Sequence, residues 1–87
     1  SSLILLERAA AEIEKSGYKI SNIDSIIVAE KPKLAPYMDA MRNNIANTLK
    51  IEADRVNIKA TTSEGLGFTG TGEGMAAYAV ACLYPNI

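Results

Sequence analysis

A stretch rich in glycine and hydroxyl side chains most strongly limits the folds open to this 87-residue chain. Residues 59–74, KATTSEGLGFTGTGEG, hold five glycines and five serine or threonine residues in sixteen positions. The alternating segment 53–62 predicts a strand that runs into this stretch, and the small-residue segment 72–84 predicts a helix after it. A glycine-rich turn between a strand and a helix exposes backbone N–H groups to an anion. The stretch therefore predicts a phosphate-binding loop.

The first third of the chain predicts a helix followed by a strand. Apolar residues at helical spacing indicate a helix over residues 2–15, with Ser2 as its N-cap and Gly17 just beyond its end. An alternating and then β-branched run indicates a strand over residues 18–30. We expect this strand to be buried on both faces at residues 26–28.

Two prolines end that strand and prepare a second helix. They lie in residues 31–36, where they hold the backbone extended, and the second suits the first turn of a helix over residues 36–49. The prediction is then three helices and only two strands, and two strands alone are marginal in water. We therefore expect residues 1–87 to form one partial domain that needs further residues, symmetry partners, or both.

Composition excludes several kinds of site and partner. Nine basic and ten acidic residues give a net charge of −1 without a basic stripe, so we expect no nucleic-acid partner. No apolar run approaches the roughly 18 residues of a membrane span, and we expect neither a membrane partner nor a signal peptide. The chain has no histidine, which excludes a self-contained His-dependent triad and a His-rich zinc site in these residues. Cys82 lies in the apolar run MAAYAVACLY and is expected to be a buried, unreactive thiol.

Four polar residues near the two loops are candidates for anion binding, each with a structural alternative. Thr61 and Thr62 either donate hydrogen bonds to phosphate or end the strand in a turn. Glu64 either holds a hard cation such as Mg²⁺ or Mn²⁺ with phosphate oxygens, or favours a helix N-terminus. Lys33 either reaches an anion or is solvated. The glycines match neither a Walker loop nor a convincing dinucleotide fingerprint, so they do not decide between these roles.

Two long segments resemble the 2-C-methyl-D-erythritol 2,4-cyclodiphosphate synthase family of the non-mevalonate route to isoprenoids. They are NIDSIIVAEKPKLAPYMDAMRNNIANTL and VNIKATTSEGLGFTGTGEGMAAYAVACL. The resemblance covers essentially the whole chain and corresponds to the later half of the family subunit. It implies an α+β fold with helices packed on one face of a small mixed β-sheet, and sheets that meet around a threefold axis in a homotrimer. It also implies active sites shared between neighbouring subunits, in the bacterial cytoplasm or a plastid-type organelle.

The resemblance implies a cyclisation reaction for the intact protein. The 2-phosphate of 4-diphosphocytidyl-2-C-methyl-D-erythritol 2-phosphate attacks the β-phosphate of its own cytidine diphosphate, and CMP leaves. A zinc ion and a second divalent cation, Mg or Mn, are implied, but the family's zinc ligands include histidines that this sequence lacks. We expect the 87 residues alone to be inactive. A catalytically silent trimeric nucleotide-binding module is the alternative, and a purely structural fragment is disfavoured because a structural turn has no need of TTSE before its glycines.

The resemblance also assigns roles to individual residues. The loop AEKPKLAP holds the nucleotide, with Lys33 on the phosphate side. Thr62 stabilises the transition state, and Glu64 ligates the second cation. Phe68 matches an aromatic residue near the threefold axis and the substrate, and Thr71 stands where many members carry a basic residue. The implied catalytic pair is Thr62 and Glu64, and the implied substrate-binding set is Ala29, Glu30, Lys31, Pro32, Lys33, Leu34, Ala35, Thr61, Thr62, Ser63, Glu64, Phe68 and Thr71.

Overall fold

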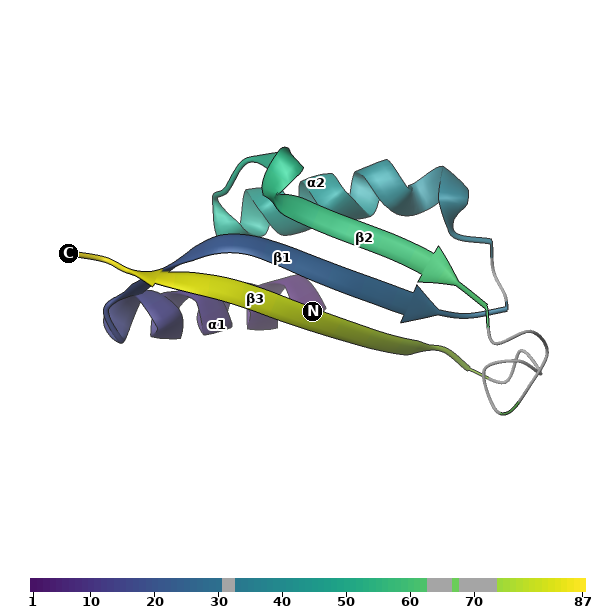
Figure 1. Cartoon of the computed structure of the whole chain (residues 1–87), viewed down its shortest axis with the longest axis horizontal. Coiled ribbons are helices and arrows are strands. Elements are labelled where there is room, and N and C mark those ends of the chain that lie inside the picture. The colour runs from purple at the N-terminus through teal and green to yellow at the C-terminus, as the bar shows by residue number, and fades with distance from the viewer. Residues whose placement is uncertain (31–32, 63–66, 68–73) are drawn as a thin grey trace.

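The computed structural model describes residues 1–30, 33–62, 67 and 74–87 (Figure 1). The chain alternates between α-helices and strands until its final strand. In order they are α1 (Ser2–Lys15), β1 (Tyr18–Val28), α2 (Met38–Leu49), β2 (Val56–Thr61) and β3 (Ala76–Pro85). Short 3-10 helices, Ala35–Tyr37 and Ala53–Arg55, lead into α2 and β2.

The strands form one mixed sheet in the order β2-β1-β3. β1 pairs in parallel with β2 and antiparallel with β3. Helix α1 packs on β1, helix α2 packs on β2, and the two helices contact each other, so both cover the same face of the sheet (Figure 1). The predicted α+β class, with helices on one face of a small mixed sheet, is confirmed.

The core lies between α2 and the β1–β2 half of the sheet. Val56, Ile58 and Ala46 are its most buried members, and Ile27 and Ile45 pack against them. Side chains alternate across β2, so Val56 and Ile58 point to the helices while their neighbours on the strand face away. This alternation explains why the sequence predicted β2 correctly.

Helix α1 spans Ser2–Lys15, as expected, but its N-cap lies one residue earlier than predicted. Ser1, rather than Ser2, is the N-cap, and its Oγ accepts the Leu3 N–H at 3.2 Å. Gly17 follows the C-cap Ser16 with a φ of 88°, a conformation that glycine adopts without the strain of a Cβ. The Gly17 carbonyl also accepts the Asn86 N–H at 2.8 Å, which ties the end of β3 to this turn.

The predicted helix over residues 72–84 is wrong, because residues 76–85 form strand β3. Its alanines favour a helix locally, but β1 offers a partner along its whole length, from Tyr18 against Pro85 to Val28 against Ala76. Cys82 is consequently exposed on an edge strand, which corrects the expected buried thiol.

The face of the sheet opposite the helices carries apolar side chains at its β3 side. Tyr78 and Val80 are 68% and 67% exposed, and Ile26 pairs with Tyr78 across the strands. Ile26 is therefore exposed, against the expectation that β1 is buried on both faces there. Toward β2 this face is polar, since Asn57 Nδ2 donates to Asp24 Oδ1 at 2.9 Å. No helix among the described residues is long and apolar enough to cross a membrane.

Lys50, directly after α2, has φ 58° and ψ 43°, and it should be the clearest site for a stabilising substitution. A non-glycine residue is strained in this left-handed conformation, whereas glycine is not. We expect Lys50→Gly to raise the free energy of unfolding by about 0.5–1 kcal/mol. The change is measured by chemical denaturation of a protein that contains these residues and has the length of the full family subunit. Lys50→Ala, which removes the charge but keeps the Cβ, is the matched control and should give no such gain.

Candidate functional site

The connections at one end of the sheet bring the two predicted loops together. The parallel strands β1 and β2 end side by side, because Val28 is the register partner of Thr61. β3 starts at the same place, since Val28 is also paired with Ala76. The chain therefore leaves the sheet after β1 and after β2, and re-enters it at the start of β3, at a single end, on the right in Figure 1. The carboxyl ends of parallel strands are the usual place for a ligand in sheets of this kind.

A backbone hydrogen bond connects the starts of the two loops. It joins Ala29, the first residue after β1, to Thr61, the last residue of β2. The Ala29 N–H donates to the Thr61 carbonyl at 3.0 Å, and Ala29 is only 8% exposed. Because Ala29 is buried, breaking this bond would leave its N–H without a hydrogen-bond partner, which is costly. The predicted nucleotide loop and the predicted phosphate turn therefore start from fixed relative positions.

The start of α2 adds backbone donors to the same end. Pro36 lies in the first turn of the 3-10 helix before α2, as predicted, and Tyr37 N–H bonds the Leu34 carbonyl at 2.8 Å. Among the described residues, no side chain caps the N-terminus of this 3-10 helix or of α2. Because α2 begins at the loop end of the sheet (Figure 1), the positive end of its dipole lies there.

The structure places part of the predicted site, in two groups at this end. Ala29 is buried, Glu30 and Leu34 are half-buried, and the rest of the described members are exposed: Lys33, Ala35, Thr61 and Thr62. The remaining predicted site residues lie outside the described residues: Lys31, Pro32, Ser63, Glu64, Phe68 and Thr71.

The Thr61 hydroxyl is held only weakly. Its Oγ1 donates to the Thr62 carbonyl at 3.5 Å, which is long for a hydrogen bond between oxygens. Because Thr61 is exposed, its hydroxyl can turn to a stronger acceptor such as a phosphate oxygen. The structure therefore permits the predicted role of Thr61 as a phosphate donor.

The residues present do not fit a zinc site. Within residues 1–30, 33–62, 67 and 74–87 no three His, Cys, Asp or Glu side chains gather as metal ligands, and the full sequence has no histidine. Glu64, the predicted ligand of the second cation, lies outside the described residues.

Two contributions to this end were missed from the sequence. The first is β3, whose start beside Val28 fixes where the glycine-rich stretch returns to the sheet. Tyr78, Val80 and Cys82 alternate with alanines, and this period of two was the available signal. The second is Lys59, which is exposed two residues before Thr61 and so lies on the same side of β2.

Comparison with known proteins places these loops in a family. A sequence model of the YgbB family matches residues 1–84, and the chain belongs to that family. A relative from Lachnospira eligens, called 2-C-methyl-D-erythritol 2,4-cyclodiphosphate synthase, is 57% identical over 83 residues. The match covers 95% of this chain and 45% of the relative.

Solved structures agree with the fold. The cyclodiphosphate synthase of Plasmodium vivax superposes with a TM-score of 0.94 at 34% identity, over 98% of this chain and 57% of its own. The Plasmodium falciparum protein in a CDP complex gives 0.93 at 30% identity, over all of this chain and 56% of its own. The chain thus spans about half the length of the relatives it matches.

Proposed function

We propose that a family-length subunit carrying these residues is a cyclodiphosphate synthase of isoprenoid biosynthesis. Its substrate is 4-diphosphocytidyl-2-C-methyl-D-erythritol 2-phosphate, and its products are 2-C-methyl-D-erythritol 2,4-cyclodiphosphate and CMP. The observation that carries the proposal is the convergence of both family loops, tied by the Ala29–Thr61 bond, at the end of parallel strands. The similarity to a CDP-bound relative supports a cytidine nucleotide as the ligand.

The reaction asks for positioning and charge stabilisation. An oxygen of the 2-phosphate forms a bond to the β-phosphorus, and the bond from that phosphorus to the oxygen of the departing CMP breaks. Phosphoryl transfer of this kind needs little covalent help from the protein. In the proposal the 29–35 loop binds the nucleotide through backbone groups, and Thr61 and Ser63 orient the diphosphate. Thr62 donates to the oxygens that gain charge in the transition state.

The proposed metals have different origins. Glu64 is proposed to hold the second divalent cation, Mg or Mn, against the diphosphate, where the cation would neutralise charge on its oxygens. Zinc ligands are proposed to come from outside these 87 residues. Each active site would then combine this chain's loops with groups from elsewhere in the assembly.

A homotrimer is the proposed assembly. The apolar side chains of Ile26, Tyr78 and Val80 lie together on the face opposite the helices and are exposed in the single chain. Contiguous apolar surface of this kind marks an interface more often than a solvated surface. In the proposal, this face meets its copies around the threefold axis, and Phe68 lies near the axis and the substrate, close to Thr71.

The alternative function is that of a trimeric module that binds a cytidine nucleotide without converting it to products. These 87 residues contain no histidine and so no zinc ligand of the family type, and they therefore do not separate this module from the synthase. Only the synthase forms products, so release of CMP distinguishes the two functions.

Nucleotide selectivity tests the proposed ligand. The protein to use is a family-length chimera, in which these residues replace the matched region of the Lachnospira eligens relative. We expect CDP to bind at least about tenfold more tightly than UDP or ADP, because a site that hydrogen-bonds a base edge rejects bases that leave its groups unpaired. Isothermal titration calorimetry measures the affinities.

The same titrations separate the parts of this proposal. Equal affinity for all three nucleotides would reject cytosine recognition and leave the phosphate site standing. No heat of binding with any of them, in a folded chimera, would reject the nucleotide site itself.

A further inference from the structure

Lys59 lies on β2, two residues before Thr61, with its side chain on the face of the sheet opposite the helices. Burial alternates along this strand, so Val56 and Ile58 face the helices while Lys59 and Thr61 face away from them. Two residues span about 6.6 Å along a strand. The flexible four-carbon stem of lysine is of similar length. The Lys59 ammonium can therefore reach the level of the Thr61 hydroxyl.

The charge of Lys59 has no acidic partner among the described residues. Its register partner on β1 is the apolar Ile26, and β1 is the only described strand beside β2. Asp24, one row further from the loops, accepts the hydrogen bond of Asn57 Nδ2 at 2.9 Å. The ion pairs of the described residues join other side chains, on the helices. The ammonium is therefore available to an anion from outside these residues.

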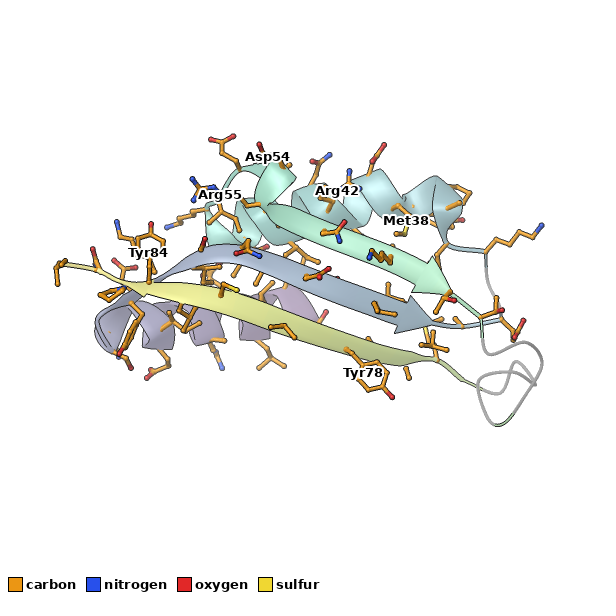
Figure 2. All side chains as sticks on the ribbon, in the orientation of Figure 1. Met38, Arg42, Asp54, Arg55, Tyr78 and Tyr84 are labelled. Carbon is orange, nitrogen blue, oxygen red and sulfur yellow. The ribbon has the colours of Figure 1, made fainter. Side chains whose placement is uncertain are left out.

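Two arginines of the described residues are less well placed for an anion at the loop end. Arg42 is on α2, where its Nη1 donates to Asp39 Oδ1 at 2.9 Å. Arg55 lies at the end of the sheet opposite to the loops (Figure 2). Lys59 is therefore the described cation on the sheet that can approach an anion held at Thr61.

We propose that the Lys59 ammonium binds the diphosphate of the nucleotide together with the Thr61 hydroxyl. The inference rests on the proposed nucleotide site and adds to it a positive charge that comes from the sheet. A diphosphate carries several negative charges, and lysine binds phosphate as a compact charge with three donors. Because Lys59 is on a paired strand and not in a loop, its backbone is in position before the ligand binds.

Calorimetry on the family-length chimera at low ionic strength tests the proposal. We expect Lys59→Gln to weaken the binding of CDP at least about tenfold, the usual loss when a hydrogen bond to a charged group is removed. The affinity for cytidine, which has no phosphate, should stay unchanged. Lys59→Arg should keep most of the affinity for CDP, because a guanidinium also binds phosphate.

Lys19→Gln is the matched control. It makes the same change of charge at an exposed position on β1, at the other end of the sheet, and should bind CDP as the parent does. Parent-like affinity for CDP in Lys59→Gln would overturn the proposal and leave the nucleotide site standing. A folded parent chimera that binds no CDP would reject the nucleotide site itself, and the role of Lys59 with it.

Lysine acetylation is a second measurement, and it needs no substitution of Lys59. In the folded parent chimera, saturating CDP should slow the reaction of Lys59 with acetic anhydride at least about fivefold, because a nearby negative charge keeps the amine protonated. Lys19 should react at the same rate with and without CDP. Peptide mass spectrometry measures both rates. The proposal is overturned if CDP does not slow the reaction of Lys59, or if Lys59 is unreactive without CDP because a neighbouring copy covers it.

Discussion

Glu64→Gln in the family-length chimera is expected to lower the rate of CMP release by about 100-fold or more, a loss of roughly 3 kcal/mol of transition-state stabilisation. The substitution keeps the size of the side chain and removes the charge proposed to hold the second cation. A neutral amide is a poor ligand for Mg²⁺ or Mn²⁺, so the diphosphate would keep its negative charge as the β-phosphorus is attacked. Steady-state and single-turnover kinetics measure the effect.

Glu52→Gln is the matched control for this prediction. Glu52 is an exposed carboxylate beside the 3-10 helix before β2, at the other end of the sheet from the loops. It should keep normal turnover, and both variants should keep the unfolding midpoint of the parent. Normal turnover by Glu64→Gln would remove Glu64 from the metal site and leave it a structural carboxylate.

The elements with a clear period were predicted from the sequence. β2 alternates buried Val56 and Ile58 with exposed Asn57 and Lys59, and this pattern holds in the sheet. The second helix was expected from its apolar spacing, and Ala46 and Leu49 on it are buried. In these segments local preference and tertiary packing favour the same structure.

β3 was not predicted, because its local and tertiary preferences differ. Its alanines suit a helix, and the partner that makes it a strand, β1, lies about 50 residues away in sequence, a separation that no local pattern reports. The same error placed Cys82 in a buried environment, whereas the strand exposes it.

The sequence indicated which residues could form the candidate site, but it did not predict how they are arranged in space. Thr61, Thr62 and Lys33 were selected for their chemistry. Thr61 is the last residue of β2, Thr62 follows it directly, and Lys33 lies between the end of β1 and α2. The Ala29–Thr61 bond was not foreseen, since it depends on the register between β1 and β2. The bond joins the backbones of Ala29 and Thr61, so no side chain in the sequence indicates it. The assignment of Glu64 to a metal remains a prediction.

The second large effect tests whether these residues supply one half of a shared active site. Two inactive chimeras are needed: one carries Glu64→Gln, and the other keeps Glu64 but lacks a proposed zinc-binding histidine in the part taken from the relative. If each site combines loops from one subunit with zinc ligands from its neighbour, some sites in mixed trimers have both halves intact. Random equal mixing makes about a quarter of the sites competent, the product of two one-in-two chances in a closed ring.

CMP release after the two inactive chimeras are unfolded and refolded together is therefore the most direct measurement of the central claim. Each chimera refolded alone is the control and should release almost none. The account predicts recovery to about a quarter of the activity of the unmutated chimera refolded in the same way. Mixed trimers identified by native mass spectrometry that show no recovered activity would contradict it.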